Sequence, residues 1–272
     1  VIASLLGDGA ALILCPATLC IQWQVELWDK LGVPSAVWTG KKTWLDHRGH
    51  HVKTRNNLQA VGQCPYQIGI VSTGLITQPT EEREVLLQKR GGFGTLILDE
   101  AHRARRSGGI GQQAGEPNNL LSFMLEAATR SKNVLLGTAT PIQTSVAELW
   151  DLLAILSQGA EFVLGRETSP WRSPSRVLEL VTGKKNLEDE QDVWDHLRNP
   201  LPPRAEGALF DHVRDDLHLA DSAFVTSRSA YDLAEFTREE MKDQSEGLEG
   251  GLAFFQRHNP ILRHTVLRRR KD

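Results

Sequence analysis

The sequence lacks the features of membrane proteins, secreted proteins and proteins that coat nucleic acid over their whole surface. None of its apolar runs reaches the roughly 18 residues of a membrane-spanning helix, and no secretory signal peptide opens the chain. Its three cysteines form no Cys-x-x-Cys pair, and Cys15 lies in an apolar run, where a reduced core thiol is expected. A net charge of −3 excludes a global basic footprint, so any nucleic-acid contact must be local. We expect a cytoplasmic protein without membrane contact.

The first 156 residues alternate short apolar runs with helical patterns, which predicts an α/β fold with a parallel sheet flanked by helices. Strands are expected at 11–15, 35–38, 68–71, 96–98 and 134–136, and helices at 1–6, 81–89, 120–129 and 146–156. A further helix follows Thr18, its predicted N-cap. Five residues form its predicted apolar face: Ile21, Val25, Leu27, Trp28 and Leu31. Residues 107–115, rich in glycine, are expected to form a loop, and an initial valine indicates a piece of a longer protein.

The pattern changes after Ser157. Residues 157–256 place proline, glycine and charged residues between short helical patterns, which predicts a mostly helical insertion on the C-terminal side of the sheet domain. Residues 257–272 carry six Lys/Arg against one Asp, a net charge of +5 with neutral histidines. This basic segment is predicted to bind phosphate or to dock a further domain. No internal repeat is visible.

The most informative residues follow the apolar run Leu96–Leu98. Asp99 and Glu100 come directly after this expected strand, so Asp99 is placed to hold a hydrated Mg²⁺ and Glu100 to deprotonate an attacking water. A second apolar run, 134–136, leads to Gly137 and to Thr138, which lies 36 residues after His102. Because α/β sheets bind ligands at the carboxyl ends of their strands, the two sets of polar groups should meet there.

Five segments of the chain resemble the motor domain of the Swi/Snf family of superfamily 2 nucleic-acid-dependent ATPases, in its bacterial RapA/HepA-like branch. They are Leu12–Leu19 with Gln22-Trp23 and Glu26-Leu27 (motif Ia), Ile70–Leu75 (motif Ib), Asp99–Arg103 (motif II, the Asp-Glu-Ala-His box), Leu136–Gln143 continued by Glu148–Leu153 (motif III), and Arg263–Arg269. The tract from Gly137 to Leu153 is the specific feature, because ordinary superfamily 2 helicases lack it. The resemblance implies a first RecA-like lobe at 1–156, a helical protrusion at 157–256 and a basic segment at 257–272 that leads to a second lobe.

The resemblance also implies a function: a fragment of an ATP-driven translocase on double-stranded DNA that uses ATP and Mg²⁺ to displace or remodel DNA-bound proteins. Asp99 would coordinate Mg²⁺ through water, Glu100 would be the catalytic base, and His102 would link the nucleotide site to motif III. The nucleotide-coupling residues would be Gly137, Thr138, Thr140 and Gln143, and the DNA-binding residues would be Pro16, Thr18, Ser72, Thr73, Arg268 and Arg269. Candidate settings are RNA-polymerase recycling and a phage-defence or restriction complex, between which the sequence does not choose.

The sequence departs from the family pattern in having no Walker A phosphate loop, Gly-x-x-x-x-Gly-Lys-Ser/Thr. Residues 40–43 and 183–186 both fail the pattern, since neither has Ser or Thr directly after Gly-Lys. In the family this loop precedes the helix expected at 1–6, so we expect it upstream. Nothing after Arg270 supplies a second lobe either. We therefore expect no ATP turnover from this chain alone.

Two rival functions remain open: a strand-separating or RNA-directed superfamily 2 helicase, and a non-catalytic scaffold derived from a motor lobe. Three groups of side chains also have two interpretations each. Three tryptophans are either core anchors, which is the favoured interpretation, or platforms for base stacking: Trp23, Trp28 and Trp150. A histidine-rich stretch is either a solvated loop, which is favoured, or a metal site: Asp46, His47, His50 and His51. An arginine run is either a solvated face or a contact to DNA or to a second lobe: Arg103, Arg105 and Arg106.

Overall fold

The structure is a computed structural model that describes residues 7, 9–53, 59–108, 114–139, 147–184, 191–192, 195–196 and 259–266. The chain divides into two compact units, residues 1–109 with 114–159, and residues 110–113 with 160–272. The helix expected at 1–6 lies outside the described residues. Among the helices that are described, none is long and apolar enough to cross a bilayer.

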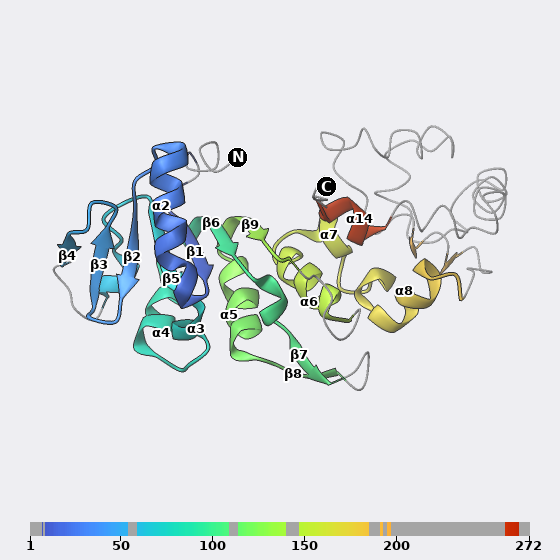
Figure 1. Cartoon of the computed structure of the whole chain (residues 1–272). Helices are drawn as coiled ribbons and strands as arrows, with labels where there is room; N and C mark the ends of the chain where they lie inside the picture. Colours follow the sequence, from blue (N-terminus) through green and yellow to red (C-terminus); the bar gives the residue numbers. More distant parts are fainter. Residues whose placement is uncertain are drawn as a thin grey trace. The chain divides into compact units, whose positions relative to one another are not determined.

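A seven-stranded, mostly parallel sheet forms the first unit, in the order β4-β3-β2-β5-β1-β6-β9 (Figure 1). The parallel strands are β1 (Ala11–Cys15), β2 (Ser35–Thr39), β5 (Ile68–Ser72), β6 (Phe93–Leu98) and β9 (Ser131–Leu136). The strands β3 (Thr43–Asp46) and β4 (His51–Val52) continue the sheet in antiparallel fashion at one edge. All five strands expected from the sequence are present, and the predicted α/β class with a mostly parallel sheet is confirmed.

Helices cover both faces of this sheet. Side chains along a strand alternate between faces. Accordingly, Leu12 and Leu14 of β1 belong to one apolar core, and Ile13 and Cys15 belong to the other. The larger core is closed by α3 (Thr73–Ile76), α4 (Glu81–Leu87), α5 (Asn119–Ala128) and α6 (Ala147–Leu156), and the smaller one by α2 (Cys20–Leu31). The helices expected at 81–89, 120–129 and 146–156 are therefore confirmed.

Two predictions about α2 are wrong. The helix begins at Cys20, after a 3₁₀ helix at Ala17–Leu19, so Thr18 lies exposed inside that turn and caps nothing. Its buried residues are Cys20, Gln24 and Leu27. The expected apolar face, apart from Leu27, is 41–58% exposed (Ile21, Val25, Trp28 and Leu31).

Gln24 explains why the predicted face of α2 fails. Its side-chain amide donates to the carbonyls of Ser35 (3.1 Å) and Leu45 (3.0 Å), so a polar residue occupies the buried centre of the helix with its donors satisfied. The periodicity of apolar residues takes no account of a buried polar residue, and it therefore predicts the wrong face of α2 as buried. Trp28 is accordingly not a core anchor, whereas Trp150 is one, with 6% exposure.

The loop expected at 107–115 is also partly wrong. Its two ends form a small antiparallel sheet of β7 (Arg106–Gly108) and β8 (Ala114–Pro117), while 109–113 lie outside the described residues. The histidine-rich stretch is a turn closed by Asp46, whose Oδ1 accepts the backbone N–H groups of Arg48 (2.9 Å) and His50 (2.7 Å). In the described ranges no three metal-ligating side chains cluster. The loop itself is confined to the residues between Asp46, the last residue of β3, and His51, the first of β4, and Asp46 is buried rather than solvated.

The second unit contains helical elements in its described part. They are α7 (Glu161–Leu164), a 3₁₀ helix at Pro170–Arg172, α8 (Pro174–Val181) and α14 (Pro260–His264). Trp171 is 1% exposed, and its indole N–H donates to the carbonyl of His196 at 2.8 Å. Most of 157–256 lies outside the described residues, so the helical insertion stays a prediction, as does the role of the basic segment 257–272.

Candidate functional site

Four parallel strands end side by side at the carboxyl edge of the sheet. The registers pair Cys15 with Ser72, Leu14 with Leu98, and Leu98 with Leu136. The residues at these strand ends therefore lie in one row: Ser72 as the last residue of β5 with Thr73 after it, Pro16 after β1, Asp99 and Glu100 after β6, and Gly137 and Thr138 after β9. This row brings together most of the described residues that the sequence singled out.

Asp99 is held in place by three hydrogen bonds. Its backbone N–H donates to the carbonyl of Leu14 at 2.8 Å, which ties the end of β6 to β1. Its Oδ1 accepts the backbone N–H of Glu100 at 2.9 Å, and its Oδ2 accepts the indole N–H of Trp23 at 2.8 Å. The carboxylate is half-buried and both of its oxygens have a partner. Its orientation is thus set by the protein.

Glu100 adopts a left-handed backbone conformation, with φ 54° and ψ 46°. Few residues other than glycine do so, and the strain of such conformations often marks functional sites. The turn is fixed on both sides, because the N–H of Ala101 donates to the carbonyl of Gly137 and the N–H of Gly137 donates to the carbonyl of Leu98, both at 2.8 Å. The Glu100 side chain remains about one-third exposed and can reach a ligand at this edge.

His102 connects the two predicted halves of the site. Its Nδ1 lies 3.1 Å from Oγ1 of Thr138 and 3.2 Å from Oε2 of Glu100. The imidazole is 14% exposed, so it is fixed between these groups rather than free in solvent. The structure therefore places Glu100, His102 and Thr138 in one connected polar group, as the spacing of the two motifs predicts.

One carboxylate of the site, that of Asp99, fits a metal ion that is bound mainly through phosphate and water. Mg²⁺ takes one or two carboxylates together with phosphate oxygens and water, rather than a cage made only of protein ligands. Asp99 supplies such a carboxylate. A β-carbon at Gly137 would lie 3.6 Å from its Oδ1, so glycine keeps the space beside this oxygen free of a side chain. The residues present fit a metal ion whose coordination is completed by phosphate and water.

The arginine run after the box has a structural explanation that the sequence did not give. Nη1 of Arg105 lies 3.0 Å from Glu148, and Nε of Arg106 lies 3.1 Å from Asp151, while the backbone N–H of Arg106 donates to Asp151 at 2.8 Å. Burial raises the pKa of the Asp151 carboxyl above its ordinary value, and the bonds from Arg106 work against that rise. Arg105 and Arg106 thus join the exit of the Asp-Glu-Ala-His box to α6. The available signal was the pair of acids three residues apart on an apolar helix.

The predicted DNA-binding residues differ in accessibility. Thr18 is exposed and Pro16 is partly exposed. The Ser72 hydroxyl accepts the N–H of Gly74 at 3.2 Å as the cap of α3. Thr73 is 3% exposed, so its side chain is not available to a phosphate, which counts against its predicted contact. Four further predicted residues lie outside the described ones: Thr140, Gln143, Arg268 and Arg269.

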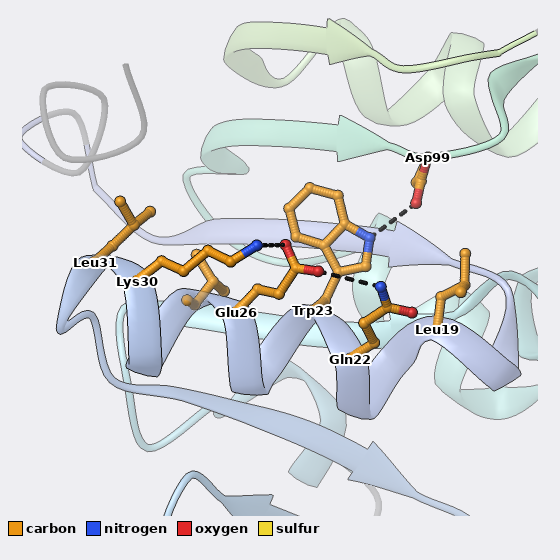
Figure 2. A pocket seen from close by; sticks show the side chains of 8 residues that line it. Leu19, Gln22, Trp23, Glu26, Lys30, Leu31 and Asp99 are labelled. Carbon is orange, nitrogen blue, oxygen red and sulfur yellow. Dashed lines mark hydrogen bonds and ion pairs between the residues drawn. The ribbon is translucent and has the colours of Figure 1, made fainter.

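Trp23 combines the predicted packing with a contact that the sequence does not predict. It is half-buried and packs against the smaller core, as a core anchor would, and its indole also reaches Asp99. Figure 2 shows it beside a hollow whose other lining residues come almost entirely from the start and the exposed side of α2. They include Leu19, Gln22 and Glu26. The available signal was a tryptophan five residues after the expected N-cap, Thr18.

Comparison with known proteins places the chain in a family. Residues 5–161 match the model of the SNF2-related domain. The chain is 27% identical over 157 residues to Protein CHROMATIN REMODELING 19 of Arabidopsis thaliana, a match that covers 54% of this chain and 18% of that protein. It is 27% identical over 205 residues to Helicase swr1 of Emericella nidulans, covering 72% of this chain and 11% of that protein.

A bacterial relative and a solved structure are also similar. The uncharacterized ATP-dependent helicase YqhH of Bacillus subtilis is 27% identical over 148 residues, covering 54% of this chain and 21% of that protein. A Sulfolobus solfataricus SWI2/SNF2 ATPase core in complex with double-stranded DNA superposes with a TM-score of 0.39 at 15% identity, over 94% of this chain and 52% of that chain. The chain spans about a fifth or less of the three curated relatives. Because the domain model matches more than half of its 272 residues, the chain belongs to the SNF2-related domain family.

Proposed function

We propose that the protein containing this chain is an ATP-driven translocase on double-stranded DNA, and that this chain forms part of its first motor lobe. One observation carries the proposal: the polar group of Asp99, Glu100, His102 and Thr138 at the carboxyl edge of the sheet. A nucleotide motor needs a carboxylate for a metal ion, a second carboxylate for water and a link to a neighbouring strand. This group supplies all three.

Each residue then has a distinct role. Asp99 would hold Mg²⁺ through water; the ion, when bound with ATP, supplies charge stabilisation at the phosphates. Glu100, partly exposed at the same edge, orients and deprotonates the attacking water. His102 contacts Glu100 and Thr138 with the same nitrogen, which can donate to only one of them at a time. A shift of β9 therefore changes how the side chain of Glu100 is held.

The phosphate loop is proposed to come from a strand elsewhere in the protein, beside β9. In the residues that the structure describes, β9 pairs on one side only, with β6. Leu135 of this strand is 37% exposed although parallel strands are usually covered on both faces. A further parallel strand at this edge would bring its own carboxyl end next to Gly137 and Asp99. This chain alone would not turn over ATP.

Contact with duplex DNA is proposed for residues at the carboxyl ends of β1 and β5. Exposed backbone and short hydroxyls, such as those at Pro16, Thr18 and Ser72, bind phosphate without reading the base sequence. The resemblance of Gly137–Leu153 to Swi/Snf motors favours translocation over strand separation. Relatives named as chromatin remodelling and helicase proteins support a remodelling role for this protein. Its targets would be DNA-bound proteins, with RNA polymerase or a defence complex as candidate partners.

The test is ATP hydrolysis by the longer polypeptide that contains these residues, with duplex DNA, single-stranded DNA, RNA or no nucleic acid, beside a Glu100→Gln variant. We expect duplex DNA to stimulate hydrolysis and the variant to abolish it while duplex binding persists. A matched control is Glu84→Gln, an exposed glutamate on α4 that does not belong to the row of strand-end residues. Stimulation by RNA or single strands alone would favour a helicase. No hydrolysis with binding intact would leave a scaffold.

A further inference from the structure

We infer that Trp23 is a positioning residue that orients Asp99 and transmits movement from the start of α2 to it. The inference rests on the proposed function for its catalytic consequence, but the contact itself stands on geometry alone. The indole N–H of Trp23 donates to Oδ2 of Asp99 at 2.8 Å across 76 residues of sequence. Among the hydrogen bonds of the described residues it is the one side-chain donor that reaches this carboxylate.

The chemistry of the donor matters. The indole is neutral and can only donate, so it fixes the carboxylate without neutralising its charge. A lysine or arginine in the same place would compete with a cation for Asp99. Oδ1 is held by the N–H of Glu100, so the two oxygens are fixed from two independent elements, the β6 turn and α2. Partners that orient a metal-binding carboxylate from outside commonly change activity or metal affinity ten- to hundred-fold when removed.

The position of Trp23 explains what it would transmit. Trp23 follows Leu19 by four residues, one helical turn, and both line the hollow that also includes Asp99 (Figure 2). The carbonyl of Pro16 accepts the N–H of Leu19 at 2.8 Å, which ties the strand-end turn to the start of α2. The Gln24 amide, bonded to two backbone carbonyls, anchors the middle of the same helix. A displacement at Pro16–Leu19 therefore tilts the first turns of α2 and moves the indole against Asp99.

Trp23 packs against the smaller core, but packing does not explain its N–H group. The side chain is half-buried beside an open hollow, and its outer neighbours on α2 are polar: Gln22 and Lys30 both contact Glu26 at 3.1 Å. A phenylalanine would keep an aromatic ring on this surface and cover most of it. The feature that phenylalanine lacks is the N–H, which is the atom that reaches Asp99. Trp23→Phe consequently separates the two roles.

The test compares Trp23→Phe with Trp28→Phe, which removes an exposed tryptophan from the same helix. The longer polypeptide is labelled with 5-fluorotryptophan, and the ¹⁹F resonance that disappears in Trp23→Phe is assigned to Trp23. We expect Asp99→Asn to shift this resonance and to leave that of Trp28 in place. In hydrolysis assays we expect Trp23→Phe to lower DNA-stimulated kcat roughly ten-fold and to raise the Mg²⁺ concentration required, with duplex affinity unchanged.

Two results would overturn the inference. If Asp99→Asn leaves the Trp23 resonance unmoved, the contact does not exist. If Trp23→Phe hydrolyses ATP and depends on Mg²⁺ as Trp28→Phe does, the contact does not position Asp99 for the reaction. Glu100→Gln is run in parallel: an active Glu100→Gln variant would refute the proposed function, whereas the resonance experiment would still decide whether Trp23 holds Asp99.

Discussion

Removing the carboxylate of Asp151 should detach α6 from the segment that leaves the Asp-Glu-Ala-His box. The side chain is 10% exposed and accepts two bonds from Arg106, one from the backbone N–H at 2.8 Å and one from Nε at 3.1 Å. Hydrogen bonds to a charged group contribute about 1.5–3 kcal/mol each when buried. The Arg106 side chain is 39% exposed and can be rehydrated, so we expect Asp151→Ala to cost about 2 kcal/mol in total.

The assay is urea unfolding of Asp151→Ala, Asp151→Asn and Arg106→Ala at pH 7. Asparagine keeps one acceptor oxygen, so its cost should be about half that of alanine. Arg106→Ala removes the guanidinium that opposes the burial-driven rise in the Asp151 pKa, so that pKa rises further. The loss of unfolding free energy caused by Arg106→Ala should therefore become smaller as the pH falls through the raised pKa of Asp151, because the neutral acid is not stabilised by the guanidinium charge. A cost below about 0.5 kcal/mol for Asp151→Ala, the level of an ordinary surface substitution, would refute this reasoning.

Three further predictions test the fold around the site. Gly92→Ala should lower the free energy of unfolding by more than about 3 kcal/mol, because φ is +61° and the new β-carbon would lie 1.7 Å from the carbonyl oxygen of Arg130. Gly91→Ala is the control: φ is +76° but no atom lies within 4 Å of the new β-carbon, so it should cost only about 1 kcal/mol. Thermal unfolding measures both. Gln24→Leu should cost about 2 kcal/mol in urea unfolding, because it leaves two backbone carbonyls without their donor; equal stability would contradict the anchoring role. Burial raises the pKa of Asp46, but the backbone N–H donors of its turn and the His50 side chain together outweigh burial and lower the pKa. The stabilisation by this carboxylate is therefore present above the unfolded pKa of about 3.9 and is lost as the pH falls through the lower folded pKa. Asp46→Asn should flatten the acid limb of the unfolding curve.

The sequence predicted what depends on local pattern and failed where distant partners decide. Five buried strands and the meeting of Asp99 with Thr138 followed from apolar runs and from the rule that parallel strands end at one edge. The buried face of α2 did not follow, because Gln24 is buried only by virtue of carbonyls 11 and 21 residues away. The hydrogen bond from Trp23 joins residues 76 positions apart, so no local sequence pattern predicts it.

Polar contacts connect the Asp-Glu-Ala-His turn to three other elements of the first unit: α2, the end of β9, and α6. Trp23 reaches Asp99 from α2, the helix that begins at the proposed DNA-contacting turn. His102 and the N–H of Ala101 reach β9 through Thr138 and Gly137. The arginines after the box reach α6 through two acids that are almost buried.

These ties have a consequence for coupling. Each of these contacts is a hydrogen bond or an ion pair, whose distance and angle vary little, whereas apolar contacts tolerate small displacements. A small movement of α2, β9 or α6 should therefore break or redirect a hydrogen bond at the Asp-Glu-Ala-His turn. The left-handed backbone of Glu100, the residue proposed as the catalytic base, lies between these hydrogen-bonded contacts. A site built in this way senses its neighbours through orientation of the carboxylates. Substitutions in the ties should therefore reduce DNA stimulation of hydrolysis more than they reduce the affinity for DNA.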